Sequence, residues 1–236
     1  MSCRPRVSSF ILRPSALAHW YRLLLAHYGP QGWWPGETPF EIAVGAILTQ
    51  NTAWVNVEKA IRHLKKAGAL SFRGMKRLAE RRLAGLIRPS GYYNQKARKL
   101  GAFLKWLEAR GGASGSVKRA LAGPLGEVRG SLLEVHGIGP ETADSILLYA
   151  GGRAVFVIDA YTRRVLARHR MPSALTADYD ELRALFESRL PRSVRLYNES
   201  HALFVRVGKE RCAKRSPRCA RCPLARIEGR RMKEEG

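Results

Sequence analysis

Apolar residues recur along most of this chain at the spacing of an amphipathic helix. The first clear segment begins with a capping box at Thr38, with proline at the first helical position. One apolar face follows, made of Phe40, Val44, Ile47 and Leu48. Only Ala154–Ile158 has the composition of an extended run, and it is too short to build a sheet. The pattern therefore predicts an all-α fold.

The remaining boundaries follow from glycine, proline and capping residues. Residues 112–123 are small and polar, which is typical of a loop or a poor short helix. Further helices are predicted near 51–67, 71–78, 79–87 and 94–110, on both sides of 136–139, and at 161–168, 179–190 and 194–207. This gives a bundle of about ten helices, arranged as two helical lobes.

Charge and composition narrow the class of partner. The 236 residues include 42 Lys and Arg against 19 Asp and Glu, for a net charge of +23, while 45% are hydrophobic. This hydrophobic fraction excludes a disordered basic tail as a description of the whole chain. No apolar run has the length of a membrane span. Four cysteines, three of them within 212–222, do not resemble a secreted disulfide framework. We expect a soluble intracellular protein with a polyanionic partner; the alternative is an arginine-rich surface that only aids solubility.

The segment His136-Gly137-Ile138-Gly139 lies between two predicted helices. Two glycines around one apolar residue permit a tight turn and leave backbone N–H groups accessible at the start of the next helix, an arrangement that binds phosphate. An ordinary hairpin between two helices is the competing interpretation.

A carboxylate follows eighteen residues after Glu141. Asp159 ends the apolar run Val155–Ile158, at the point where the next helix is expected to begin. By itself such a residue is most simply an N-cap.

Taken together, the hairpin and the aspartate resemble the signature of the helix-hairpin-helix (HhH-GPD) DNA glycosylases of the endonuclease III superfamily. Leu48-Thr49-Gln50-Asn51-Thr52 is similar to another segment of that superfamily. Three stretches look like its 3-methyladenine DNA glycosylase branch: Trp33-Trp34-Pro35, residues 88–97, and residues 139–144. The resemblance runs from about residue 31 to residue 222.

The resemblance implies a division of the chain into two domains. A six-helix, barrel-like domain would span 31–153 and contain the hairpin at about 126–150. A second helical domain would combine 1–30 with 154–236 and end in a cysteine-rich loop at 212–228. The active-site cleft would lie between the two lobes.

It also implies catalytic roles for two carboxylates. Asp159 would stabilise the positive charge that develops on the sugar and activate a water molecule. Glu141 stands where the bifunctional members carry the lysine that forms a Schiff base with C1′, and a carboxylate cannot do so. The chain is therefore expected to be monofunctional; an adjacent lysine could in principle substitute, and Lys209 is the candidate.

The remaining site residues are assigned by the same resemblance. A flipped cationic purine favours aromatic faces, and each tryptophan in the predicted pocket could instead fill the core. The predicted base pocket comprises Trp33, Trp34, Pro35, Trp54 and Lys209. The predicted DNA contacts are Gln50, Gly137, Ile138, Gly139, Arg163, Arg164, Lys214, Arg215 and Arg218. Gln50 is equally a candidate for filling the gap left by the flipped nucleotide or for supporting the fold.

The cysteine spacing matches three of the four ligands of the superfamily's [4Fe–4S] loop. Cys212, Cys219 and Cys222 are present, while the fourth position is Glu228. The sequence predicts a [4Fe–4S] cluster held by three thiolates and a fourth ligand. A labile or lost cluster, zinc, or Cys3 as the substitute ligand remain alternatives.

The sequence thus predicts a monofunctional base-excision-repair DNA glycosylase that releases 3-methyladenine or a related alkylated purine from double-stranded DNA. The alternatives are a bifunctional endonuclease III-type glycosylase for oxidised pyrimidines and a non-catalytic DNA-binding hairpin module. We expect a monomer without membrane attachment, located in the cytoplasm of a prokaryote and associated with the nucleoid.

Overall fold

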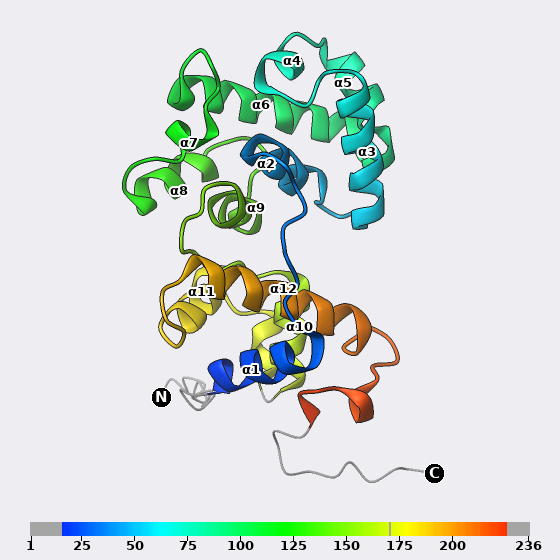
Figure 1. Ribbon diagram of the computed structural model, residues 1–236, viewed down its shortest axis with the longest axis vertical. Helices are drawn as coiled ribbons and strands as arrows, with labels where there is room; N and C mark the ends of the chain where they lie inside the picture. The colour runs from blue at the N-terminus through cyan, green and yellow to red at the C-terminus, as the bar shows by residue number, and fades with distance from the viewer. Residues whose placement is uncertain (1–15, 170, 226–236) are drawn as a thin grey trace, which may run out of the picture. The chain divides into compact units, whose positions relative to one another are not determined.

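The computed structural model describes residues 16–169 and 171–225, and its regular structure is helical (Figure 1). No strand occurs within these ranges, which confirms the all-α prediction, and residues 154–158 have no regular secondary structure. Within the same ranges, no helix is both long enough and apolar enough to cross a membrane.

The chain folds into two compact units. The hairpin unit comprises residues 32–157 and 193–198; the aspartate unit comprises the described residues 16–31, 158–169, 171–192 and 199–225. The hairpin unit contains α2 (Pro39–Leu48), α3 (Trp54–Lys66), α4 (Phe72–Lys76), α5 (Glu80–Leu86), η1 (Arg88–Ser90), α6 (Tyr93–Gly111), α7 (Val117–Ala120), α8 (Leu125–Leu133), α9 (Pro140–Ser145) and the π-helical turn η2 (Ile146–Ala150). The aspartate unit contains α1 (Ala16–Tyr28), α10 (Ala160–Arg168), η3 (Pro172–Leu175), α11 (Tyr179–Glu187), most of α12 (Val194–Glu210) and η4 (Cys219–Arg221).

The long helix α6 organises the hairpin unit. It contacts α2, α5 and α7 and runs along most of the unit (Figure 1). Its apolar face buries Leu100, Phe103 and Leu107 completely, as their spacing of three and four residues requires. Helix α2 is buried over almost its whole length, so the residues that follow it have a fixed starting point.

Local capping explains several helix starts. The Thr38 hydroxyl accepts a hydrogen bond from the Glu41 amide at 3.1 Å, and the Ser71 hydroxyl accepts one from Gly74 at 3.0 Å, which confirms both predicted caps. The predicted start of the next helix near Asn51 is wrong. Asn51 adopts a left-handed φ of +52°, so the chain turns there and α3 begins only at Trp54.

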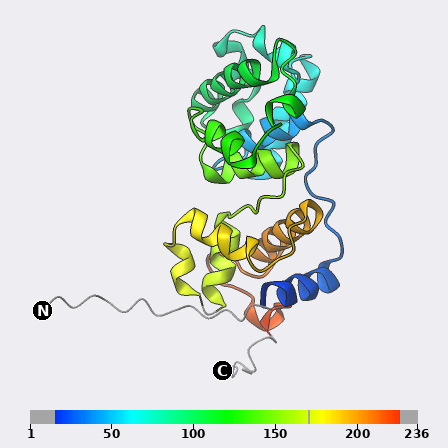
Figure 2. The ribbon, with the colours of Figure 1, turned by 90° about the vertical axis from the view of Figure 1, so that its left-hand side faces the viewer.

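Helix α1 is absent from the predicted set of helices. It buries Leu17, Trp20 and Leu24 on one face. The Trp20 ring lies 6.3 Å from the ring of Phe204 in α12, and the two helices lie side by side (Figure 2). These contacts make α1 part of the core of the aspartate unit.

Candidate functional site

Residues 134–139 connect α8 to α9 as a tight hairpin. Gly137 adopts a φ of +80°, a conformation that favours glycine, and Gly139 is the N-cap of α9. Ile138 between them is only 4% exposed and anchors the turn in the core of the hairpin unit.

The amide of Gln50 holds this hairpin from across the unit. Its Nε2 donates to the Gly137 carbonyl at 3.0 Å and to the Thr142 hydroxyl at 2.9 Å. Its Oε1 accepts a hydrogen bond from Lys99 Nζ at 2.6 Å. All of these bonds support the fold, and they orient the Gln50 amide toward both ends of the turn. A role for Gln50 in filling the gap in DNA stays a prediction.

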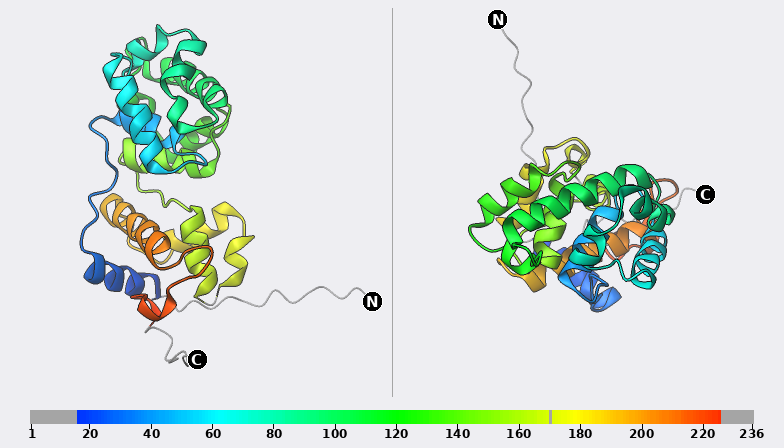
Figure 3. Two further views of the ribbon diagram at one scale, coloured as in Figure 1. Left: turned by 90° about the vertical axis from the view of Figure 1, so that its right-hand side faces the viewer. Right: turned by 90° about the horizontal axis from the view of Figure 1, so that it is seen from above.

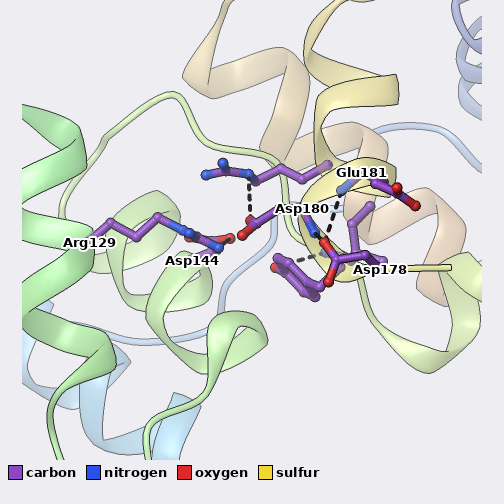
Figure 4. A network of polar contacts seen from close by, with 8 residues as sticks. Arg129, Asp144, Asp178, Asp180 and Glu181 are labelled. Carbon is purple, nitrogen blue, oxygen red and sulfur yellow. Dashed lines mark hydrogen bonds and ion pairs between the residues drawn. The ribbon is translucent and has the colours of Figure 1, made fainter.

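A buried ion pair joins the two helices of the hairpin (Figure 4). Arg129 of α8 donates from Nε to Asp144 Oδ1 at 2.7 Å and from Nη2 to Oδ2 at 3.2 Å. The Asp144 side chain is fully buried and that of Arg129 is 11% exposed. The two-point contact fixes the distance between α8 and α9, and therefore the shape of the turn between them.

A buried lysine fixes the end of α2 just before Gln50. Lys96 is 2% exposed, and its Nζ donates to the carbonyls of Leu48 at 2.8 Å and Ser90 at 2.7 Å. Burial, together with the positive charge of Lys99, lowers the pKa of Lys96 to about 8. Lys96 therefore binds the carbonyl end of α2, where a cation is favoured, and sets the position of the segment 49–52.

The three predicted pocket tryptophans, Trp33, Trp34 and Trp54, form one cluster. The ring of Trp34 lies 5.4 Å from Trp33, 5.1 Å from Trp54 and 5.0 Å from Tyr149. All three indoles are half-buried. Gly45 lies beneath them, and a Cβ there would lie 3.4 Å from Trp34 and 3.6 Å from Trp54. Both are ordinary van der Waals distances, so the Trp34 and Trp54 rings lie against α2 at this position.

Two other predicted site residues of the hairpin unit, Pro35 and Glu141, are exposed. Pro35 follows the two adjacent tryptophans. Glu141 lies in the first turn of α9, where the positive end of the helix dipole favours a carboxylate. No lysine occupies this turn.

Asp159 is the N-cap of α10 in the aspartate unit. Its Oδ1 accepts a hydrogen bond from the Thr162 amide at 2.7 Å, and the residue is 9% exposed. Its Oδ2 lies 3.7 Å from Nε2 of His201, which α12 supplies. The capping interpretation and a catalytic one are compatible, because the cap uses only Oδ1.

His201 is 4% exposed, and burial lowers the pKa of its imidazole below the ordinary value of 6.5, although the charge of Asp159 opposes the shift. The imidazole is therefore neutral at pH 7.

This histidine should make the protein less stable in acid. Below about pH 6.5 the unfolded chain binds a proton at His201 that the folded chain resists, so the free energy of unfolding falls by at most about 1.4 kcal/mol per pH unit from this group. His201→Gln should reduce that slope, as measured by urea unfolding at a series of pH values. Equal slopes for both proteins would show that His201 does not titrate in this way.

Lys209 lies in the same unit as Asp159. Its Nζ is 5.9 Å from the centre of the Tyr161 ring, and the guanidinium of Arg164 is 4.9 Å from that ring. Gly208 packs on Tyr161 so closely that a Cβ would come within 2.7 Å of it. The glycine therefore allows α12 to approach the start of α10, which brings Lys209 near the residues that follow Asp159.

The two predicted DNA-contact arginines of α10 are engaged within the aspartate unit. Arg163 donates to the carbonyls of Ala174 at 3.0 Å and Ala177 at 2.8 Å. Arg164 donates to the carbonyls of Cys212 at 2.6 Å and Gly208 at 3.0 Å. Both side chains therefore order neighbouring backbone, and contact with DNA stays a prediction for each.

A cysteine-bearing loop follows α12 (Figure 3). Lys214, Arg215 and Arg218 are exposed, as a phosphate-binding role requires. Arg168 ties down the start of this loop by donating to the Ala213 carbonyl at 2.7 Å and to Cys212 Sγ at 3.1 Å.

The described part of the loop does not complete a metal site. Cys212, Cys219 and Cys222 carry free thiols. Burial raises the pKa of Cys222, with smaller contributions from the other two cysteines. No group of three His, Cys, Asp or Glu side chains arranged to hold a metal ion exists among residues 16–169 and 171–225. The predicted fourth ligand, Glu228, and the alternative ligand, Cys3, lie outside the described residues, so the [4Fe–4S] cluster stays a prediction.

The helical pattern and the resemblance do not identify several residues that shape the site. These residues are His201, Lys96, Lys99, Tyr149 and the Arg129–Asp144 pair. The tryptophan cluster, Glu141 and the hairpin belong to the hairpin unit, while Asp159, Lys209 and the basic loop belong to the aspartate unit.

Comparisons with known proteins agree on one family. Residues 44–192 match the family described as "HhH-GPD superfamily base excision DNA repair protein". A relative from Methanocaldococcus jannaschii named "Putative DNA repair glycosylase" is 44% identical over 204 residues, which cover 86% of this chain and 91% of the relative.

Solved structures share the fold. The H. pylori 3-methyladenine DNA glycosylase bound to 1,N6-ethenoadenine is 30% identical with a TM-score of 0.67, and the match covers 84% of this chain and 97% of that one. An endonuclease III in a non-covalent complex with DNA is 19% identical with a TM-score of 0.74, and the match covers 91% of this chain and 94% of that one.

Proposed function

The chain belongs to the HhH-GPD superfamily of base excision DNA repair proteins, and we propose that it is a monofunctional DNA glycosylase for 3-methyladenine or a related alkylated purine. The observation that carries the substrate class is the cluster of Trp33, Trp34 and Trp54 with Tyr149. A purine nucleotide alkylated at a ring nitrogen, such as 3-methyladenine in DNA, is cationic, so stacking and cation–π attraction both favour it over a neutral base on such aromatic faces. The similar H. pylori enzyme, with its 1,N6-ethenoadenine, supports a modified adenine.

In the proposed reaction, the damaged nucleotide leaves the duplex and its base stacks on the tryptophan cluster. Cleavage of the bond between C1′ and the base nitrogen builds positive charge on the sugar. The Asp159 carboxylate stabilises that charge and accepts a proton from the attacking water. The base departs as a neutral purine, because it carries its positive charge before the bond breaks. No step is assigned to a metal.

Glu141 supports a reaction without strand cleavage. Its carboxylate cannot form the Schiff base that β-elimination requires, and it stands where the bifunctional members of the family carry a lysine. Lys209 is the amine that could act in its place, since its Nζ lies 5.9 Å from the centre of the Tyr161 ring, two residues after Asp159.

A single incubation tests this proposal. Duplexes that contain methylated purines, oxidised pyrimidines or uracil are mixed with the protein, and released bases and strand breaks are measured separately. We expect release of the methylated purine, intact strands until alkali is added, and no protein–DNA complex after borohydride reduction.

A borohydride-trapped complex would contradict the monofunctional mechanism. If that complex also disappears in Lys209→Ala, the nucleophile is Lys209 and the protein is bifunctional. Release of oxidised pyrimidines alone would favour an endonuclease III-type activity, and the absence of any released base would favour a non-catalytic DNA-binding module.

A further inference from the structure

An open groove of about 410 Å³ lies on the hairpin unit, and the first residues of the hairpin, 134–136, form part of its wall. One wall is the C-terminal half of α6, with Lys105, Trp106 and Arg110. The other wall is the end of α8 and the chain that leads into the turn, with Ser131, Glu134 and His136. His136 directly precedes Gly137, so the groove is continuous with the hairpin.

The groove combines positive charge with a fixed aromatic ring. Lys105 and His136 are exposed on its two walls, and the single carboxylate among the lining residues is Glu134. The half-buried indole of Trp106 is held by a hydrogen bond from its Nε1 to the Ser131 hydroxyl at 3.2 Å and by stacking on Phe103. The Arg110 guanidinium lies 6.0 Å from the same ring. Nucleic-acid strands bind to surfaces of this kind, where cations meet phosphates and a rigid ring meets a sugar or base.

Helix α6 links this groove to the hairpin. Lys99, two turns before Trp106 on the same helix, lies so close to Gly137 that a Cβ on the glycine would come within 2.4 Å of the lysine side chain. A DNA strand bound at the hairpin would therefore lie close to Lys99, and a strand that continued along α6 would reach Lys105.

We propose that this groove binds the sugar–phosphate backbone of the DNA strand that continues beyond the hairpin, with Lys105 and His136 as phosphate contacts and the Trp106 ring as a packing surface. The proposal rests on the DNA glycosylase function proposed above. It adds a segment of DNA contact that shares no residue with the tryptophan cluster and is independent of which base is excised.

The test compares Lys105→Ala and Lys105→Glu with Lys118→Ala, an exposed lysine of α7 outside the groove. Equilibrium binding is measured on lesion-containing duplexes whose flank is lengthened stepwise on either side, at several salt concentrations. Lys105→Ala should weaken binding to the long duplex roughly threefold to tenfold and reduce the slope of log K against log salt by about 1. Lys105→Glu should weaken it further, and Lys118→Ala should behave as wild type.

The wild-type protein should gain affinity when one flank is extended, and the Lys105 variants should lose that gain while binding the shortest duplex normally. Base release at saturating DNA should stay at the wild-type rate in every variant, because Lys105 does not touch the excised base. If Lys105→Ala and Lys118→Ala bind all duplexes alike, the groove does not contact DNA. Failure of the proposed function would be seen separately, as a lack of base release by the wild-type protein.

Discussion

Asp159→Asn should lower the rate of base release by about 10²–10³-fold or more, while binding to lesion-containing duplex stays near the wild-type value. The physical reason is the loss of one buried negative charge at the point where the sugar becomes positive. Asparagine keeps the shape of the side chain but cannot stabilise a cation or accept a proton from water. The measurement is single-turnover release of the methylated base together with a binding isotherm on the same duplex.

Asparagine also caps helices about as well as aspartate, so the α10 start should survive the substitution. This separates the catalytic role of Asp159 from its capping role, since the bond from the Thr162 amide to Oδ1 can persist. Asp178 provides the matched control. It is the N-cap aspartate of α11 in the same unit, and its Oδ1 accepts hydrogen bonds from the Asp180 and Glu181 amides (Figure 4). Asp178→Asn should leave base release unchanged; equal rates for the two variants would remove Asp159 from the mechanism.

Local signals in the sequence predicted the helical elements well. Thr38 and Ser71 cap the helices they were expected to cap, because such a bond joins residues three positions apart. Asp159 follows the same rule. Asn51 shows the limit: its left-handed conformation delays α3 to Trp54, and nothing in the surrounding helical pattern marks that turn.

The contacts that shape the site could not be predicted in this way. Gln50 and the hairpin carbonyl it binds are 87 residues apart, and Lys96 binds a carbonyl 48 residues away. His201 reaches Asp159 from another helix. Pattern and propensity describe neighbours within a few residues, whereas these pairs are set by how whole helices pack. The resemblance identified the residues proposed for catalysis and base binding. The residues that hold them in position could be identified only from the packing of the helices.

The packing of the helices also changes how the net charge of +23 is understood. Arg163 and Arg164 look like phosphate contacts in the sequence, yet both donate to backbone carbonyls. Arg129 and Lys96 are buried. Part of the positive charge thus stabilises the fold, while Lys214, Arg215 and Arg218 remain exposed for a polyanion.

Asp144→Asn should destabilise the protein by about 3–5 kcal/mol, because it removes the carboxylate that forms two charge-assisted hydrogen bonds with the buried Arg129 guanidinium. The pair is a two-point contact between α8 and α9, with a fully buried Asp144 side chain (Figure 4). Asn carries no charge and has a single oxygen acceptor, so this two-point contact is lost. Urea unfolding followed by circular dichroism measures the effect. The hairpin turn should also loosen, and DNA binding should weaken under conditions in which the variant is still folded.

Asp180→Asn is the matched control for this effect. Asp180 pairs with Arg183 at 3.4 Å in the aspartate unit, but its side chain is 54% exposed, so water screens the pair (Figure 4). Loss of this ion pair should change the free energy of unfolding by about 1 kcal/mol or less.

A double variant, Arg129→Met with Asp144→Leu, should recover most of the stability lost by Asp144→Asn, because it removes both charges from the core. If the double variant regains stability but binds DNA as weakly as Asp144→Asn, the ion pair sets the geometry of the hairpin. If Asp144→Asn and Asp180→Asn lower the free energy of unfolding by the same amount, the buried pair does not hold α8 and α9 together.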